Sequence, residues 1–353
     1  MRILITGAAG LLGSAITRGI IESGSDDVIL AVDDLSGGEL ENLPQISRTK
    51  DYLHFYQGDL LNEKFTEEIF ASERPEIVYH CAAVAREGAS EFQPLKIVKT
   101  NALMSAILLE LSVKYKVRRF LFCSSMSVYG SQKTPFDETL RPRPVDPYGA
   151  SKAMTELLIQ QLGETHGFEW VLLRPHNVVG IGQALFDPYR NVAGIFINRI
   201  LRGESPLYIY GENHKRAFSA IEDCTPCLIT AITSKEANHQ IINLGGCEPI
   251  TVTELANAIL EDFHDWFEEG RVQKPKLEVV GPRPHETKEA FSTVEKSEKI
   301  LGYRENVGWK RSIKRMVAWA KTRGPREWRW DILPLLTEQA PPTWRELNRT
   351  FYP

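Results

Sequence analysis

A tyrosine and a lysine four residues apart, Tyr148 and Lys152, form the clearest catalytic pattern in this sequence. Residues at this spacing share one face of a helix, so a phenol and an ammonium group can reach one site. A free tyrosine has a pKa near ~10, and an adjacent cation favours the phenolate. The pair therefore predicts a general base that works near neutral pH once positive charge lies beside it.

A serine-rich turn precedes this pair. The segment Cys123–Gly130 reads CSSMSVYG and ends a short apolar run, Phe120–Ser124, that has the composition of a strand. A serine of this turn would stand at the carboxyl end of a parallel strand, where open α/β sheets bind their ligands. The turn and the tyrosine–lysine pair are therefore expected to meet at one site.

Three glycines, Gly7, Gly10 and Gly13, separate the first strand-like run from the first helical segment. Glycine lets the backbone turn tightly and approach a pyrophosphate, which then rests on the N-terminus of the helix. Asp33 ends the second apolar run twenty residues past Gly13, and a carboxylate there can accept both hydroxyls of an adenosine ribose. It would repel a 2′-phosphate, and no arginine follows closely, so NAD is favoured over NADP.

Strand-like runs alternate with helical segments over the first 175 residues, and the longest helical segments are Glu63–Ala71, Leu95–Lys114 and Tyr148–Glu164. Such alternation requires crossover connections and a parallel sheet covered on both faces. The predicted fold class is α/β, a Rossmann-type doubly wound parallel sheet with a smaller C-terminal α/β substrate domain.

The composition changes after Arg174-Pro175, where a segment rich in glycine, proline and polar residues begins. This change divides the chain into three expected regions. Residues 1–175 are expected to form the NAD-binding domain with the catalytic residues, and 176–308 mostly the substrate domain, interleaved with the first. Residues 309–353 form a C-terminal helix and a tail, and they hold five of the seven tryptophans. Aromatic residues serve mainly in packing, so this tail is expected to pack on the body of the protein.

Composition excludes several classes of function. The 42 Lys+Arg residues against 46 Asp+Glu give a net charge of −4, which supplies no basic field for nucleic acid or an anionic membrane. The apolar run at the N-terminus is too short for a signal peptide, and the five cysteines suit reduced thiols, so a cytoplasmic protein is expected. Cys224 and Cys227 have the spacing of half a zinc site, but no second pair exists; we expect structural burial and no metal.

Taken together, the glycine pattern, Asp33, the serine turn and the Tyr148–Lys152 pair resemble the extended short-chain dehydrogenase/reductase family. The branch most similar is that of the NAD-dependent nucleotide-sugar epimerases and dehydratases, and within it the UDP-sugar 4-epimerases. Further motifs of that branch continue the resemblance to about Gly302-Tyr303, so it covers about 300 residues and leaves the Trp-rich tail outside.

The resemblance implies a role for individual residues. The catalytic residues are Ser125, Tyr148 and Lys152. The expected cofactor-binding residues are Gly7, Gly10, Leu11, Leu12, Gly13, Asp33, Asp34, Asp59, Leu60, Ala82, Ala83, Asn101, Tyr148 and Lys152. The expected substrate-binding residues are Ser125, Ser127, His176, Asn177, Arg216, Arg283 and Glu286. Within that last set the two arginines hold the nucleotide pyrophosphate, a group that needs charge-assisted donors.

The serine turn separates the branches of the family. The 4,6-dehydratases and decarboxylases of the family carry acidic residues where this chain has Met126-Ser127. Met126 and Ser127 cannot perform general acid–base work. The 3,5-epimerase/reductases place a cysteine at the position of Ser127. The remaining reaction is oxidation and re-reduction at one carbon, which needs only the three catalytic residues and NAD.

The predicted function is therefore epimerisation at C4 of a UDP-hexose or UDP-N-acetylhexosamine through a 4-keto sugar. A 2-epimerase of a CDP-sugar, or another nucleotide-sugar oxidoreductase, would use the same residues and remains an alternative. A catalytically silent NAD-binding regulatory protein is the alternative of a different class, and it would be expected to lack Tyr148 or Lys152.

Two further expectations concern the partner and the pocket. In the family the two long helices pair across a two-fold axis, which implies a homodimer. The resemblance also places Ala290 where members restricted to hexoses carry a bulky tyrosine, so a pocket with room for an N-acetyl group is expected. A shift of the alignment by one residue would put Phe291 there and reverse this expectation.

Overall fold

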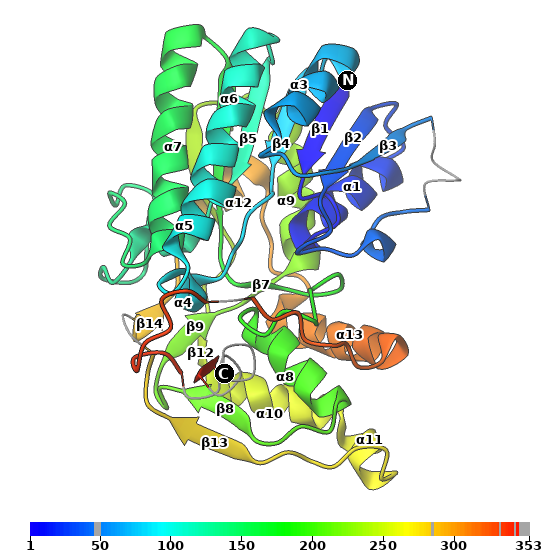
Figure 1. Ribbon diagram of the computed structural model, residues 1–353, viewed down its shortest axis with the longest axis vertical. Helices are drawn as coiled ribbons and strands as arrows, with labels where there is room; N and C mark the ends of the chain where they lie inside the picture. Colours follow the sequence, from blue (N-terminus) through cyan, green and yellow to red (C-terminus); the bar gives the residue numbers. More distant parts are fainter. Residues whose placement is uncertain (46–50, 284–285, 332, 342–343, 346–353) are drawn as a thin grey trace.

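A seven-stranded, wholly parallel sheet forms the centre of the computed structural model, which describes residues 1–45, 51–283, 286–331, 333–341 and 344–345 (Figure 1). Its strands are β1 (Arg2–Thr6), β2 (Val28–Asp33), β3 (Leu53–Gln57), β4 (Ile77–His80), β5 (Arg119–Cys123), β6 (Glu169–Pro175) and β11 (Gln240–Leu244). The order across the sheet is β11-β6-β5-β4-β1-β2-β3, and every neighbouring pair is parallel. The predicted doubly wound sheet is confirmed.

Helices cover both faces of this sheet (Figure 1). One face carries α1 (Leu11–Glu22), α9 (Ile221–Thr233) and α12 (Glu295–Leu301). The other carries α3 (Glu63–Glu73), α6 (Met104–Lys114) and α7 (Pro147–His166). The segment from α9 to β11 follows the first half of the smaller region in sequence but returns to the sheet, so the chain crosses between the two regions more than once.

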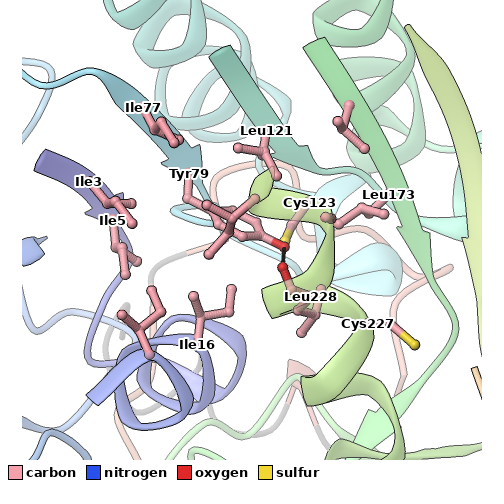
Figure 2. Packing of buried hydrophobic residues seen from close by; sticks show 14 of the residues in the cluster. Ile3, Ile5, Ile16, Ile77, Tyr79, Leu121, Cys123, Leu173, Cys227 and Leu228 are labelled. Carbon is pink, nitrogen blue, oxygen red and sulfur yellow. Dashed lines mark hydrogen bonds between the residues drawn. The ribbon is translucent and has the colours of Figure 1, made fainter. Parts of the chain in front are cut away.

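The strands are apolar throughout because both of their faces are buried. On β1, Ile3 and Ile5 pack toward α1 and α9, whereas Leu4 packs toward the opposite layer. Figure 2 shows the first of these layers, where the Tyr79 hydroxyl donates a 3.0 Å hydrogen bond to the carbonyl oxygen of Leu228 on α9. Cys227, the residue before Leu228, is buried in the same apolar layer, as is Cys224. The predicted structural burial of these two cysteines is confirmed.

The smaller region forms around a second apolar core. Its helices are α8 (Val192–Leu201), α10 (Val252–Asp262), α11 (His264–Glu268) and α13 (Gly308–Arg323). Its strands form short sheets: β8 (Leu207–Tyr210) with β13 (Leu277–Val280), and β9 (Lys215–Ala217) with β12 (Pro249–Thr251) and β14 (Glu289–Ala290). A further pair, β7 (Val178–Val179) with β10 (Ser219–Ala220), lies between the two regions. In the described part of the chain no helix is long and apolar enough to span a membrane.

The predicted long helix Leu95–Lys114 is not a regular α-helix throughout. It consists of α5 (Pro94–Ile97), a π-helical stretch η2 (Val98–Leu103) and α6. Asn101 lies in the π-helical stretch, and its side chain accepts a 2.8 Å hydrogen bond from the backbone N–H of Val84. A wider turn of this kind commonly occurs near functional sites, and here it lies beside the loop that follows β4. Shorter helical segments are η1 (Leu40–Asn42), α4 (Glu87–Ser90) and η3 (Met126–Tyr129).

Candidate active site

A cavity of about 1060 Å³ extends from the carboxyl ends of the central strands into the smaller region. The strand order reverses between β1 and β4, and open α/β sheets bind ligands at such a point. Of the predicted cofactor residues, those on the cavity wall are Gly7, Gly10, Leu11, Leu12, Gly13, Asp33, Asp34, Asp59, Leu60, Ala82, Ala83, Tyr148 and Lys152. Of the predicted substrate residues, those on the wall are Ser125, Asn177, Arg216, Arg283 and Glu286.

The glycine turn leaves no room for side chains at two of its positions. Gly7 has a φ of +66°, and a Cβ atom there would lie 2.7 Å from the backbone of Ala82. A Cβ atom on Gly13 would lie 2.2 Å from the carbonyl oxygen of Gly7. α1 begins after Gly10 without a side-chain cap, so its first N–H groups remain available to a ligand in the cavity. This backbone fits the pyrophosphate of a dinucleotide.

Asp33 is fixed at the end of β2 by two backbone hydrogen bonds. Its Oδ2 accepts from the N–H of Ala9 at 2.9 Å, and its Oδ1 accepts from the N–H of Leu35 at 2.7 Å. Burial raises the pKa of the Asp33 carboxyl, although these two donors oppose the rise. A buried carboxylate beside the glycine turn fits the adenosine ribose of NAD and disfavours a 2′-phosphate.

The catalytic helix α7 begins where the sequence places two helix-start signals together. Asp146 is the N-cap residue and accepts a 2.8 Å hydrogen bond from the N–H of Gly149, while Pro147 occupies the first turn. A Cβ atom on Gly149 would lie 2.7 Å from the carbonyl oxygen of Ser127. Glycine at this position therefore lets the start of α7 contact the serine turn closely, and this contact brings Tyr148 next to Ser125.

Ser125 and Tyr148 are hydrogen-bonded through their side chains. The Ser125 hydroxyl oxygen also accepts from the Ser127 hydroxyl at 2.9 Å and from the Ser127 N–H at 3.2 Å. Ser125 can therefore donate its own proton toward Tyr148 or a ligand. Burial raises the pKa of Tyr148, and the bond from Ser125 lowers it. A positive charge bound in the site would lower it further.

Lys152 lies one helical turn after Tyr148 on α7. Its Nζ donates a 2.8 Å hydrogen bond to the carbonyl oxygen of Cys123 and lies 5.9 Å from the centre of the Tyr148 ring. Burial lowers the pKa of Lys152 to about 8. The helix is itself anchored to the sheet by a buried ion pair, in which Arg174 Nη2 lies 2.6 Å from Glu156 Oε2.

An arginine pair occupies the part of the cavity that extends into the smaller region. Glu286 Oε1 lies 2.8 Å from Arg283 Nη2 and 3.7 Å from Arg216 Nη2. Burial raises the pKa of the Glu286 carboxyl, but the two arginines outweigh this effect and hold the pKa below its ordinary value. Glu286 occupies only part of the donors of the two guanidinium groups, which leaves others for a second anion such as a diphosphate.

Three predicted site residues, His176, Ser127 and Asn101, are not among the residues that line the cavity. His176 is fully buried, and its Nε2 bonds the carbonyl oxygen of Ala290 at 3.1 Å. Ser127 lies behind Ser125, to which it donates, and Asn101 bonds the loop after β4. Ser127 and Asn101 thus contact the wall residues Ser125 and Val84 from behind.

Ala290 also does not line the cavity. It is 2% exposed and packs in a small apolar cluster with Met126 and Phe136. The expectation that Ala290 sets the room for an N-acetyl group is therefore not supported by its position.

Sequence reasoning missed several residues on the cavity wall. They are Glu87 on α4, Tyr189 and Arg190 in the loop before α8, and Trp328, Trp330 and Trp344 in the tail. Glu87 interacts electrostatically with Arg216, Arg283 and Glu286, and more weakly with Tyr148, while burial raises its own pKa. The concentration of tryptophans at the end of the chain was the available signal, but it does not say which surface they cover.

The comparison with known sequences identifies the family. A sequence profile of the NAD dependent epimerase/dehydratase family matches residues 3–245, so the chain belongs to this family of NAD-dependent enzymes, and the predicted cofactor and resemblance are confirmed. The chain is 29% identical over 323 residues to dTDP-D-glucose 4,6-dehydratase of Mus musculus, covering 90% of this chain and 88% of that protein. It is 30% identical over 324 residues to UDP-glucose 4-epimerase of Dictyostelium discoideum, covering 86% and 91%.

The fold is similar to that of a solved UDP-glucose 4-epimerase with UDP-glucose from Thermotoga maritima. The TM-score is 0.80 at 30% sequence identity, and the match covers 92% of this chain and 99% of that chain. The smaller region is thus part of the similarity as well as the central sheet.

Proposed function

We propose that this enzyme epimerises a UDP-sugar at C4 by transient oxidation to a 4-keto sugar and re-reduction. The observation that carries the proposal is one cavity whose wall holds Ser125, Tyr148 and Lys152 next to the glycine turn and, further along, the arginine pair. A nucleotide sugar has the same sequence of groups, because a diphosphate joins the reacting sugar to the nucleoside.

Each catalytic side chain has a defined task in this reaction. Tyr148 takes the proton of the C4 hydroxyl, and Ser125, whose own oxygen already accepts from Ser127, donates to the sugar oxygen. The buried Lys152 ammonium lowers the pKa of the tyrosine through its positive charge. NAD, when bound, supplies the acceptor and donor of hydride.

The arginine pair explains how one site can reduce either face of the ketone. Arg216 and Arg283 hold the diphosphate while the 4-keto sugar turns about its link to the phosphate. Glu286 keeps the two guanidinium groups in place but satisfies only part of their hydrogen-bonding capacity. The sugar can therefore present its opposite face without leaving the cavity.

A 4,6-dehydratase is the alternative that the relatives raise, and the serine turn argues against it. Dehydration needs an acid and a base at neighbouring carbons, whereas Met126 and Ser127 follow Ser125 in this chain. Glu87 is a carboxylate on the cavity wall, but its main electrostatic partners are the two arginines. It therefore belongs with the diphosphate-binding part of the cavity.

Product analysis tests the proposal. The purified protein is supplied with UDP-glucose, UDP-N-acetylglucosamine, dTDP-glucose and a CDP-sugar, and products are resolved by NMR. We expect inversion at C4 of a UDP-sugar with no loss of water. Inversion at C2, formation of a 4-keto-6-deoxy sugar, or binding of NAD without turnover of any of these sugars would each refute the proposal.

The second part of the proposal is a homodimer formed by α5–η2 and α7. Five large apolar side chains are exposed on these neighbouring segments: Leu95, Val98, Leu103, Met154 and Leu157. Large apolar residues concentrated on one face typically mark a protein interface. A second copy of the chain offers the same face and would form a four-helix contact about a two-fold axis.

A further inference from the structure

The C-terminal tail, here residues 324–345 as far as they are described, follows α13 and runs across the opening between the two regions (Figure 1). It begins on α8, where Arg326 and Asn198 form two hydrogen bonds of 2.8 and 2.9 Å. It continues to the segment between α4 and α5, where the N–H of Leu335 donates to the carbonyl oxygen of Phe92 at 3.0 Å. The tail therefore contacts both regions.

A charged cluster fixes the middle of the tail. Asp331 accepts hydrogen bonds from Arg86 Nη1 and from Lys96 Nζ, the latter at 2.6 Å. Arg86 is buried and also donates through Nε to Asp187 Oδ2 at 2.9 Å. One buried guanidinium group thus joins the tail to the loop that precedes α8. Loss of the Asp187 or the Asp331 carboxylate would leave part of the positive charge of the buried Arg86 without a partner. The ion pairs therefore strongly favour this position of the tail.

Aromatic rings form a continuous row along the tail. The ring centres of Trp328 and Trp330 are 6.3 Å apart, those of Trp330 and Tyr189 are 5.7 Å apart, and those of Tyr189 and Trp344 are 5.3 Å apart. The last two contacts are edge-to-face, the geometry that aromatic pairs prefer. All four rings lie on the cavity wall. Tyr189 and Trp344 are also buried in a small apolar cluster with Phe92, against which Trp330 packs, and this cluster holds the rings in place at the cavity wall.

The two ends of the row have different neighbours on the cavity wall. Trp328 Nε1 donates to Glu204 Oε1 at 3.0 Å, just before β8, and both residues line the cavity. At the other end, a Cβ atom on Gly88 would lie 3.5 Å from Trp344 Cη2 and 3.3 Å from Arg283 Nη1. Trp344 therefore lies beside the arginine that would hold the diphosphate.

We propose that the tail is a substrate-specificity wall, in which Trp328 contacts the nucleobase and Trp330 and Trp344 cover the diphosphate and sugar. This inference rests on the proposed function, which sets the direction of the nucleotide sugar in the cavity. Indole rings offer flat apolar surface to a base or to the apolar face of a pyranose, with few rotatable bonds to immobilise. By excluding water, the same wall retains the keto sugar while it turns.

The test measures the binding of UDP-glucose by calorimetry in a Tyr148→Phe background. Because this background cannot turn over the sugar, the measurement separates the effect of the wall on binding from any effect on catalysis. We expect Trp328→Ala and Trp330→Ala each to weaken UDP-glucose binding about tenfold, which corresponds to the loss of one good aromatic contact. The amount of bound NAD should stay at the wild-type level. Trp330→Phe should recover most of the loss, and it provides a test if Trp330→Ala folds poorly.

The matched controls are Trp319→Ala and Leu335→Ala. Trp319 is a tryptophan of α13 that packs on the second core away from the cavity, and Leu335 is an exposed residue of the tail itself. Both should bind UDP-glucose like the parent protein. Unchanged affinity for UDP-glucose in Trp328→Ala and Trp330→Ala would overturn the proposal that the tail is a substrate-specificity wall. Binding without turnover in the enzyme that retains Tyr148 would instead overturn the proposed function, and no binding in the parent protein would overturn both.

Discussion

Lys152 donates its hydrogen bond to the carbonyl oxygen of Cys123 at 2.8 Å, whereas its Nζ lies 5.9 Å from the centre of the Tyr148 ring. The spacing of four residues brings both side chains to one site, but the lysine donates its hydrogen bond to the backbone and not to the tyrosine. Burial lowers the pKa of Lys152 to about 8, so its positive charge is lost as the pH rises through this value.

Replacement of Tyr148 by phenylalanine should remove catalysis and leave cofactor binding intact. The ring remains to fill the site, but no group is left to accept the hydroxyl proton. We expect turnover of the UDP-sugar to fall about 10²–10⁴-fold, the range typical of a lost general base. Bound NAD, measured after denaturation of the purified variant, should equal that of the wild type; an equal loss of NAD would show that Tyr148 acts mainly in cofactor binding.

Replacement of Asp33 by alanine should weaken NAD binding and reduce discrimination against NADP. The carboxylate accepts from the N–H groups of Ala9 and Leu35, so its loss also loosens the loop beside the ribose. Titration of the apo-protein with both dinucleotides measures the two dissociation constants. Asp26→Ala is the control, because Asp26 is an exposed residue before β2 that does not line the cavity. An unchanged ratio of NAD to NADP affinity in Asp33→Ala would contradict the assigned role.

The buried His176 should make the folded state sensitive to acid. Burial lowers its pKa to about 4, against about 6.5 in an unfolded chain. Below pH 6.5 the unfolded chain binds a proton that the folded chain does not bind until about pH 4, so this contribution to stability is complete above pH 6.5 and is lost as the pH falls.

The measurement compares the free energy of unfolding of the wild type and His176→Gln at several pH values. The wild type should lose about 1.6 kcal/mol relative to the variant between pH 6.5 and 5, because the slope approaches about 1.4 kcal/mol for each pH unit only below pH 6.5. Comparison with the variant cancels the contributions of other titrating groups. A difference that stays constant over this range would mean that His176 is protonated in the folded protein.

A charge placed on the apolar face of α7 should separate the proposed dimer. Leu157→Glu puts a carboxylate at the centre of the face formed with α5–η2, and burial of an unpaired charge is strongly unfavourable. Light scattering at micromolar concentration should report a dimer for the wild type and a monomer for the variant. Val279→Glu, a similarly exposed position on β13, is the control and should remain dimeric. A monomeric wild type would rule out the interface.

Local pattern was enough to predict the parts of the site that lie next to regular elements. The glycine turn, Asp33 and the Tyr148–Lys152 pair each sit within a few residues of a strand end or a helix start, where chain geometry is set by short-range rules. The alternation of strands and helices likewise determined the sheet, because parallel strands need crossover connections. All these residues line one cavity in the structure.

Long-range packing decided which of the other predicted residues face the cavity and where the C-terminal tail lies. The sequence carries no local signal for either. His176 and Ser127 have suitable chemistry and neighbouring positions, but long-range packing decides which side of a turn faces the cavity. It directs His176 to Ala290 and places Ser127 behind Ser125. The tail is the extreme case. Asp331 meets Arg86 across 245 residues of chain through a segment without periodicity, so only the folded protein places its tryptophans on the wall of the cavity.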